Sequence, residues 1–184
     1  MSNFDFDIVI DLDDFKRFEH IFDKIGVKVE QAIKEGIFDL AKQSEEKLKE
    51  NLNRFGLGGS RLASSARAEM VDDLTFKLVV DASVQTENDG LVEYAMFVEF
   101  GTGVIGKAVP HPNPNFGGYG FKSWTYDSKG HGEYGWGYIK DNKLYWTLGQ
   151  QARPFMYLTW KWIRESGTNI IQGHVNRALK ELAK

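Results

Sequence analysis

Cysteine is absent from this sequence of 184 residues. Its absence excludes disulfide bonds, thiolate zinc sites and cysteine nucleophiles, and leaves the redox compartment undetermined. Basic residues are not in excess either: 23 Lys and Arg against 26 Asp and Glu give a net charge of −3. We therefore do not expect a chain that coats nucleic acid electrostatically.

Long apolar runs are also missing. The amino-terminal MSNFDFD has neither the basic region nor the apolar core of a signal peptide. No apolar stretch approaches the roughly 20 residues that a membrane helix needs. We expect a protein that is made and kept in the cytoplasm and has no membrane partner.

What the chain does contain is typical of one globular domain. Hydrophobic residues make up 42% and charged residues 27% of it, which argues against wholesale disorder. The length fits a single domain covering residues 1–184. A Gly-rich and aromatic excursion occupies about 104–148.

The first third of the chain predicts a strand and a long helix. Residues 3–12 alternate apolar and acidic positions, as in a half-buried strand. Residues 15–52 carry apolar side chains at steps of three and four, and would form a helix of roughly 55 Å if unbroken. Gly26 and Gly36 are the expected places for a break or bend. FGLGGS, at 55–60, ends the helix.

The middle of the chain predicts a hairpin and a short helix. Residues 62–71 and 74–80 alternate apolar and polar side chains around Asp72-Asp73, which indicates two strands joined by an acidic turn. Residues 85–90 are polar and read as a loop. Residues 91–100 fit a short helix.

The remainder predicts an irregular region, a second hairpin and two helices. Residues 104–138 are too rich in Gly and Pro for a regular element. The second hairpin pairs 138–139 with 144–146. Pro154 suits a first helical turn, and Ser166-Gly167 is expected to end that helix before a last one capped by Thr168. The predicted fold class is α+β: an antiparallel sheet of hairpins packed by a long N-terminal helix and C-terminal helices.

Glu99 lies within YAMFVEFGTG, between two phenylalanines and before a Gly-Thr-Gly turn. Aromatic walls that desolvate the carboxylate would suit a general acid. A glycosidase-like mechanism needs a second carboxylate, and the spacing of Asp127 and Glu133 singles out neither. We favour a structural role, in which Glu99 pairs with Arg153 at the start of the helix after ARPF. Gly101 and Gly103 would then permit the turn.

No residue pattern indicates a metal or cofactor. The histidines, at positions 20, 111, 131 and 174, show no ligand spacing and read as surface or loop residues. GLGGS lacks the Gly-Lys-Ser/Thr ending of a phosphate loop and reads as a connector. We predict no catalytic, cofactor or metal site.

Aromatic residues of the Gly-rich region admit two interpretations. They could stack on sugar rings or bases, or they could pack on the sheet or on a neighbouring subunit, which we favour. The residues that we single out are Trp124, Trp136, Tyr138 and Trp146.

Two short motifs carry a resemblance to a known family. The order of elements and the YAMFVEFGTG and QARPFM segments resemble the neck, or tail-completion, family of long-tailed bacteriophages and prophages. That family shows a Tyr-Ala-x-x-Val-Glu-x-Gly-Thr core and, later, a glutamine ahead of a Pro-Phe pair. The corresponding positions here are Tyr94, Ala95, Val98, Glu99, Gly101 and Thr102, and then Gln150, Ala152, Arg153, Pro154 and Phe155.

The resemblance implies a non-enzymatic structural protein of phage morphogenesis. Such a protein would form a ring, commonly hexameric, at the head–tail junction of the virion, after assembly in the bacterial cytoplasm. Its partners would be the head connector or head-completion protein and the tail tube or tail terminator protein. DNA would at most pass through the lumen. The structural and interface residues would include Tyr94, Glu99, Phe100, Gly101, Thr102, Gly103, Arg153, Pro154 and Phe155, with the aromatic residues named above.

A carbohydrate- or cell-wall-binding module is the alternative. It would use the Trp- and Tyr-rich loop, with Trp124, Trp136 and Trp146, as a stacking platform. A small hydrolase that depends on Glu99 is a third possibility, and would lose its activity but not its fold in Glu99→Gln.

Overall fold

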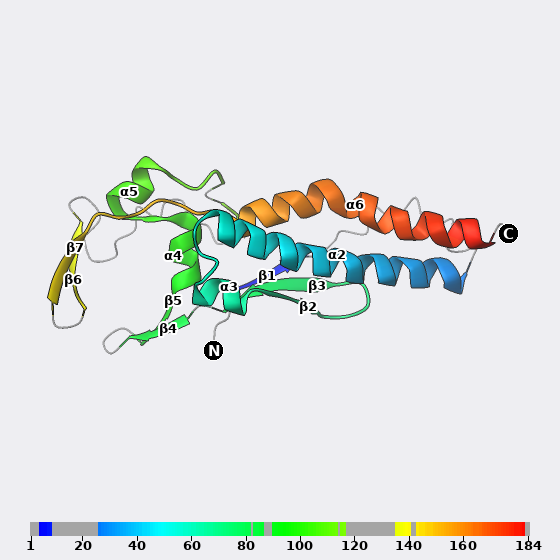
Figure 1. Ribbon diagram of the computed structural model, residues 1–184, viewed down its shortest axis with the longest axis horizontal. Helices are drawn as coiled ribbons and strands as arrows, with labels where there is room; N and C mark the ends of the chain where they lie inside the picture. The colour runs from blue at the N-terminus through cyan, green and yellow to red at the C-terminus, as the bar shows by residue number, and fades with distance from the viewer. Residues whose placement is uncertain are drawn as a thin grey trace.

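The computed structural model describes residues 4–8, 26–81, 83–86, 90–113, 115–116, 135–140 and 143–182. Two long helices lie side by side along the long axis of the molecule, and the strands lie on one side of them and beyond one end (Figure 1). The expected α+β class is confirmed. The helices are α2 (Val27–Arg54), α3 (Arg61–Ser65), α4 (Tyr94–Phe100), α5 (Gly103–Ala108) and α6 (Phe155–Leu182).

The α2 and α6 helices pack antiparallel although about a hundred residues separate them. The Gly36 backbone lies against Ile171, and Asn51 Nδ2 donates to Thr159 Oγ1 at 3.0 Å. Most of the core lies along this pair. It includes Val29, Ile33, Ile37, Leu40, Leu48, Leu52, Phe155, Ile163, Ile171 and Val175. Burial of this apolar stripe supplies most of what holds the two helices together.

A three-stranded antiparallel sheet covers another side of α2. Its order is β1 (Phe4–Ile8), β3 (Phe76–Val80), β2 (Arg67–Met70). The register pairs Phe6 with Leu78, and Ala68 with Leu78 on the other edge of β3. The sheet is tied to α2 because the Ala68 N–H donates to Glu45 Oε2 at 2.9 Å, and Lys34 pairs with Asp73 at 2.8 Å. The expected hairpin around Asp72-Asp73 is confirmed.

Two further hairpins extend beyond the sheet. One joins β4 (Ser83–Thr86) to β5 (Gly90–Glu93), and the other joins β6 (Trp136–Lys140) to β7 (Lys143–Thr147). The second was expected, and its register pairs Tyr138 with Tyr145. A two-residue strand, β8 (Gly149–Gln150), follows. In Figure 1 the β6–β7 hairpin lies at the end of the molecule opposite the end of α6.

Four local expectations are wrong. The short helix expected at 91–100 begins only at Tyr94, since residues 90–93 form β5. Of the polar run at 85–90, residues 85, 86 and 90 belong to strands of the β4–β5 hairpin, because strand pairing is made by the backbone and does not require apolar side chains. The expected strand at 62–71 begins only at Arg67, since residues 61–65 form α3. Residues 103–108 form the short helix α5 within the region expected to be irregular.

The helix breaks expected at Gly36 and at Ser166-Gly167 are not observed. The α2 helix begins directly after Gly26, whose φ is 69°, but runs unbroken through Gly36. A Cβ at Gly36 would lie 2.9 Å from Ile171 Cα, so this glycine allows close helix packing. The α6 helix likewise runs through Ser166-Gly167, where Gly167 lies against Leu40. Tertiary contacts override the weak local preference of glycine to end a helix.

The part of the predicted helix before Gly26 lies outside the described residues, as do residues 3 and 9–12 of the predicted first strand. In the part of the chain that the structure describes, no helix is long and apolar enough to cross a membrane.

Candidate functional site

Glu99, near the end of α4, has no solvent exposure. Its two carboxylate oxygens accept hydrogen bonds from the first free amides of α6: Met156 N–H to Oε2 and Tyr157 N–H to Oε1, both at 2.9 Å. The first amides of a helix have no partner within that helix, and the helix dipole favours a negative charge there. Glu99 is thus a cap for α6, supplied from 57 residues earlier in the chain.

His111 is the third partner of this carboxylate. Its Nε2 lies 3.1 Å from Glu99 Oε1, and its Nδ1 lies within hydrogen-bonding distance of the Asn113 backbone. When the carboxylate is ionised it only accepts hydrogen bonds, and Nε2 is then the donor. His111 lies in a loop, as one of the two expectations had it, but its side chain is buried, which corrects the expectation of a surface histidine.

Aromatic rings enclose the His111 imidazole. The ring centroids of Phe100, Tyr157 and Phe116 lie 4.6, 5.2 and 5.9 Å from that of His111. Trp160 continues the cluster against Phe116 and Tyr157. These rings are stacked, tilted or edge-on, and they separate the Glu99–His111 pair from solvent.

Burial raises the pKa of the Glu99 carboxyl, and the hydrogen bonds from His111 and from the Met156 and Tyr157 amides oppose that rise. A raised pKa and an adjacent histidine are features of acid–base catalysts. Both groups, however, are closed off from solvent, and every oxygen of the carboxylate already has a protein donor. The arrangement is built to hold three segments together.

The turn after Glu99 forms a second set of contacts. Gly101 and Gly103 have φ values of 77° and 62°, in the left-handed region that favours glycine. Thr102 bridges to Gln150, whose backbone N–H donates to Thr102 Oγ1 at 3.2 Å. A Cβ at Gly101 would lie 2.6 Å from the Ala152 nitrogen. The backbone of the Gly101–Gly103 turn therefore packs directly against the backbone of residues 149–152, ahead of α6.

The structure brings the two motifs together, but not through the side chain of Arg153. The Arg153 N–H donates to the Val98 carbonyl at 2.9 Å, whereas the Glu99 oxygens receive the helix amides and His111. The expected Glu99–Arg153 ion pair is thus replaced. The physical reason is that a helix which starts at Phe155 aims its own unpaired amides at the carboxylate.

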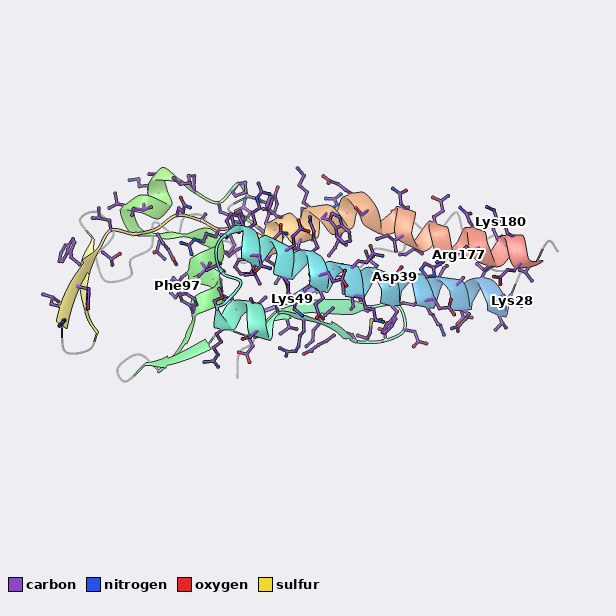
Figure 2. The ribbon with its side chains drawn as sticks, in the orientation of Figure 1. Lys28, Asp39, Lys49, Phe97, Arg177 and Lys180 are labelled. Carbon is purple, nitrogen blue, oxygen red and sulfur yellow. The ribbon has the colours of Figure 1, made fainter. Side chains whose placement is uncertain are left out.

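The other residues of the two motifs have distinct environments. Phe155 is fully buried, Phe100 is buried, and the Pro154 carbonyl accepts from Leu158 N–H at 3.0 Å. Tyr94 is exposed at the first position of α4. Figure 2 labels Phe97, whose carbonyl accepts from the Gln150 side chain at 3.1 Å.

Of the aromatic residues singled out in the excursion, two lie on β6 and one on β7. Trp136 and Tyr138 belong to β6, whose backbone pairs with β7. Trp146 on β7 is 66% exposed and Leu144 is 75% exposed. Trp124 lies outside the described residues, as do Asp127 and Glu133, the candidate second carboxylates.

Open hollows lie elsewhere. One, of about 330 Å³, lies beside the GLGGS loop and Lys49. Another, of about 430 Å³, lies between the start of α2 and the end of α6, where Figure 2 shows Lys28 and Arg177 at the same end of the helix pair. Its lining also includes Glu35 and Glu181, so it has no single charge. Within the described ranges, no three His, Asp or Glu side chains are grouped to hold a metal ion.

Comparisons with protein-family models, with curated proteins and with solved structures found no match to this chain.

His111 is the residue that sequence reasoning missed. It lies between Pro110 and Pro112, and paired prolines restrict the backbone around a residue. That restriction was the available signal that this histidine is held in place, but it does not name the partner.

Proposed function

We propose that this chain is a non-enzymatic structural subunit of the neck of a long-tailed bacteriophage or prophage. In this role it assembles into a ring at the head–tail junction, where it completes the tail or joins it to the head connector. The virion is then its place of action, and the ring is commonly hexameric in the family that the sequence resembles.

One support is the way the two family-like motifs fit together. The first ends in a carboxylate, Glu99, that caps the helix beginning in the second, and the Gly101–Gly103 turn fits against the segment from Gln150 to Ala152. The motif residues thus serve to build a corner, and the buried Glu99–His111 pair offers no access to a substrate.

The observation that carries the proposal is the β6–β7 hairpin. The large side chains described on β7, which are Leu144, Tyr145 and Trp146, are all exposed, as is Leu148 directly after the strand. Large apolar and aromatic side chains on an exposed arm are typical of contact with another protein. A ring subunit needs such a surface toward its neighbour.

Light scattering across a concentration series, with negative-stain images of the same fractions, tests this function. We expect a shift from monomer to one defined oligomer and rings with a central channel. A protein that stays monomeric at every concentration would count against a self-assembling ring.

Exposed Trp146 also keeps the carbohydrate-binding alternative open. A binding module would show quenching of tryptophan fluorescence by glycans while monomeric. The neck protein would oligomerise and show no response to glycans.

A further inference from the structure

A second exposed apolar surface lies on the opposite side of α2 from α6. Phe38 on α2 is 50% exposed, Val71 is 59% exposed, and Met70 is also exposed. We call Phe38, Met70 and Val71 the turn patch, because the last two lie where β2 passes into the β2–β3 turn.

Two contacts between α2 and the β2–β3 hairpin place these three residues together. Glu45 Oε2 accepts from the Ala68 N–H, and Lys34 pairs with Asp73, so residues 68 to 73 run antiparallel to residues 45 to 34 of the helix. At 100° per residue, positions 34, 38 and 45 lie within about 40° of one another on the helix. Phe38 therefore lies between the Glu45–Ala68 and Lys34–Asp73 contacts. It is on the side of α2 that faces Met70 and Val71.

The turn patch and the β6–β7 hairpin are separated along the molecule. Figure 1 shows the hairpin beyond one end of the helix pair, and the β2–β3 turn beside the middle of α2. A subunit cannot cover its own turn patch with its own hairpin at that separation. A second copy of the chain can.

The two surfaces also match in chemistry. Each presents large apolar side chains: Leu144 and Trp146 on the hairpin, and Phe38 with Val71 on the turn patch. Exposed Lys143 precedes Leu144 on the hairpin, and exposed Asp72 follows Val71 at the turn patch, where Lys42 also lies over the Phe38 ring, 4.5 Å from its centroid. Opposite charges that flank an apolar contact favour one orientation of the partners.

We propose that the β6–β7 hairpin of one copy docks on the turn patch of the next, with Trp146 and Leu144 against Phe38 and Val71 and Lys143 facing Asp72. This inference rests on the proposed ring function and names its subunit contact. The two surfaces differ, so the contact is head to tail, the type that closes into a ring when the rotation between subunits allows.

A mixing experiment tests the head-to-tail contact. Trp146→Asp removes the hairpin contact and keeps the turn patch, whereas Phe38→Asp removes the turn patch and keeps the hairpin. We expect each variant alone to be monomeric at concentrations where the unaltered protein assembles. Mixed in equal amounts, the two variants retain one matched pair of surfaces and should form a dimer, with association more than tenfold tighter than either shows alone.

Controls separate this contact from folding and from the function itself. Val27→Asp, at an exposed apolar position outside both surfaces, should assemble like the unaltered protein. Lys143→Glu should weaken assembly, and adding Asp72→Lys should restore it. If the unaltered protein assembles but the mixed variants stay monomeric, the head-to-tail pairing is wrong and the ring function stands. If the unaltered protein never assembles, the ring function fails and this contact fails with it.

Discussion

Glu99 and His111 meet in the interior of the protein, with 3.1 Å between Oε1 and Nε2 and almost no exposure of either side chain. The carboxylate also receives two amides of α6, so one side chain links α4, the loop at His111 and the start of a 28-residue helix. A buried carboxylate is stable only when it is this fully hydrogen-bonded.

Replacing Glu99 by alanine should destabilise the fold strongly. Glu99→Ala leaves the Met156 and Tyr157 amides and His111 without their acceptor inside the protein. We expect a loss of about 3 kcal/mol or more in the free energy of unfolding, measured by urea denaturation. Glu50→Ala, which removes an exposed pair with Lys47, should cost under about 1 kcal/mol. Similar losses for the two variants would contradict the bracing role.

The raised pKa of Glu99 predicts a pH dependence of stability. The folded protein retains the Glu99 proton to a higher pH than the unfolded chain, whose ordinary value is 4.5. The stability that the protonated Glu99 carboxyl contributes is therefore complete below that ordinary pKa. It is lost as pH rises through the folded-state pKa.

Glu99→Gln removes this titration and isolates it from that of other carboxylates. We expect the difference in unfolding free energy, unaltered protein minus Glu99→Gln, to shrink as pH rises above the ordinary pKa of 4.5. Urea denaturation at stepwise higher pH measures it. A difference that grows with pH would mean that the hydrogen bonds outweigh burial and lower the pKa.

Two glycines of the helix pair should respond in opposite ways to alanine. Gly36→Ala gains helix propensity but places Cβ 2.9 Å from Ile171 Cα, and backbone cannot move aside cheaply. We expect a net loss of about 1–3 kcal/mol. Gly173→Ala on α6 meets nothing within 4 Å and should gain up to about 1 kcal/mol. Thermal and urea unfolding compare the pair, and a gain at both positions would refute the close packing of α2 on α6.

The turn after Glu99 should depend on glycine at position 101. Gly101→Ala would hold a side chain at a φ of 77° and bring Cβ to 2.6 Å from the Ala152 nitrogen. We expect a loss of about 2 kcal/mol or more, combining backbone strain with overpacking. Gly59→Ala, which meets nothing within 4 Å, is the control and should change stability by less than about 1 kcal/mol. Equal changes in the stability of the two variants would show that the turn at Gly101 tolerates a side chain.

Much of the local structure could be predicted from the sequence. Apolar steps of three and four gave α2 its buried stripe, and the alternation around Asp72-Asp73 indicated the β2–β3 hairpin. Both patterns report which face of an element avoids water, and that preference is local. The α+β class followed from them.

Only the tertiary structure determined which groups contact Glu99 and the helix glycines. The sequence singled out Glu99 and the start of the last helices, but assigned the carboxylate to the Arg153 side chain. In the fold its donors are backbone amides and His111, and any sequence has such amides wherever a helix happens to begin. Gly36 and Gly167 show the same limit: glycine predicts a break locally, but the approach of Ile171 and the packing against Leu40 turn each into a helix contact. Sequence pattern determined which residues leave water, whereas the meeting of segments far apart in the chain determined what each of them touches.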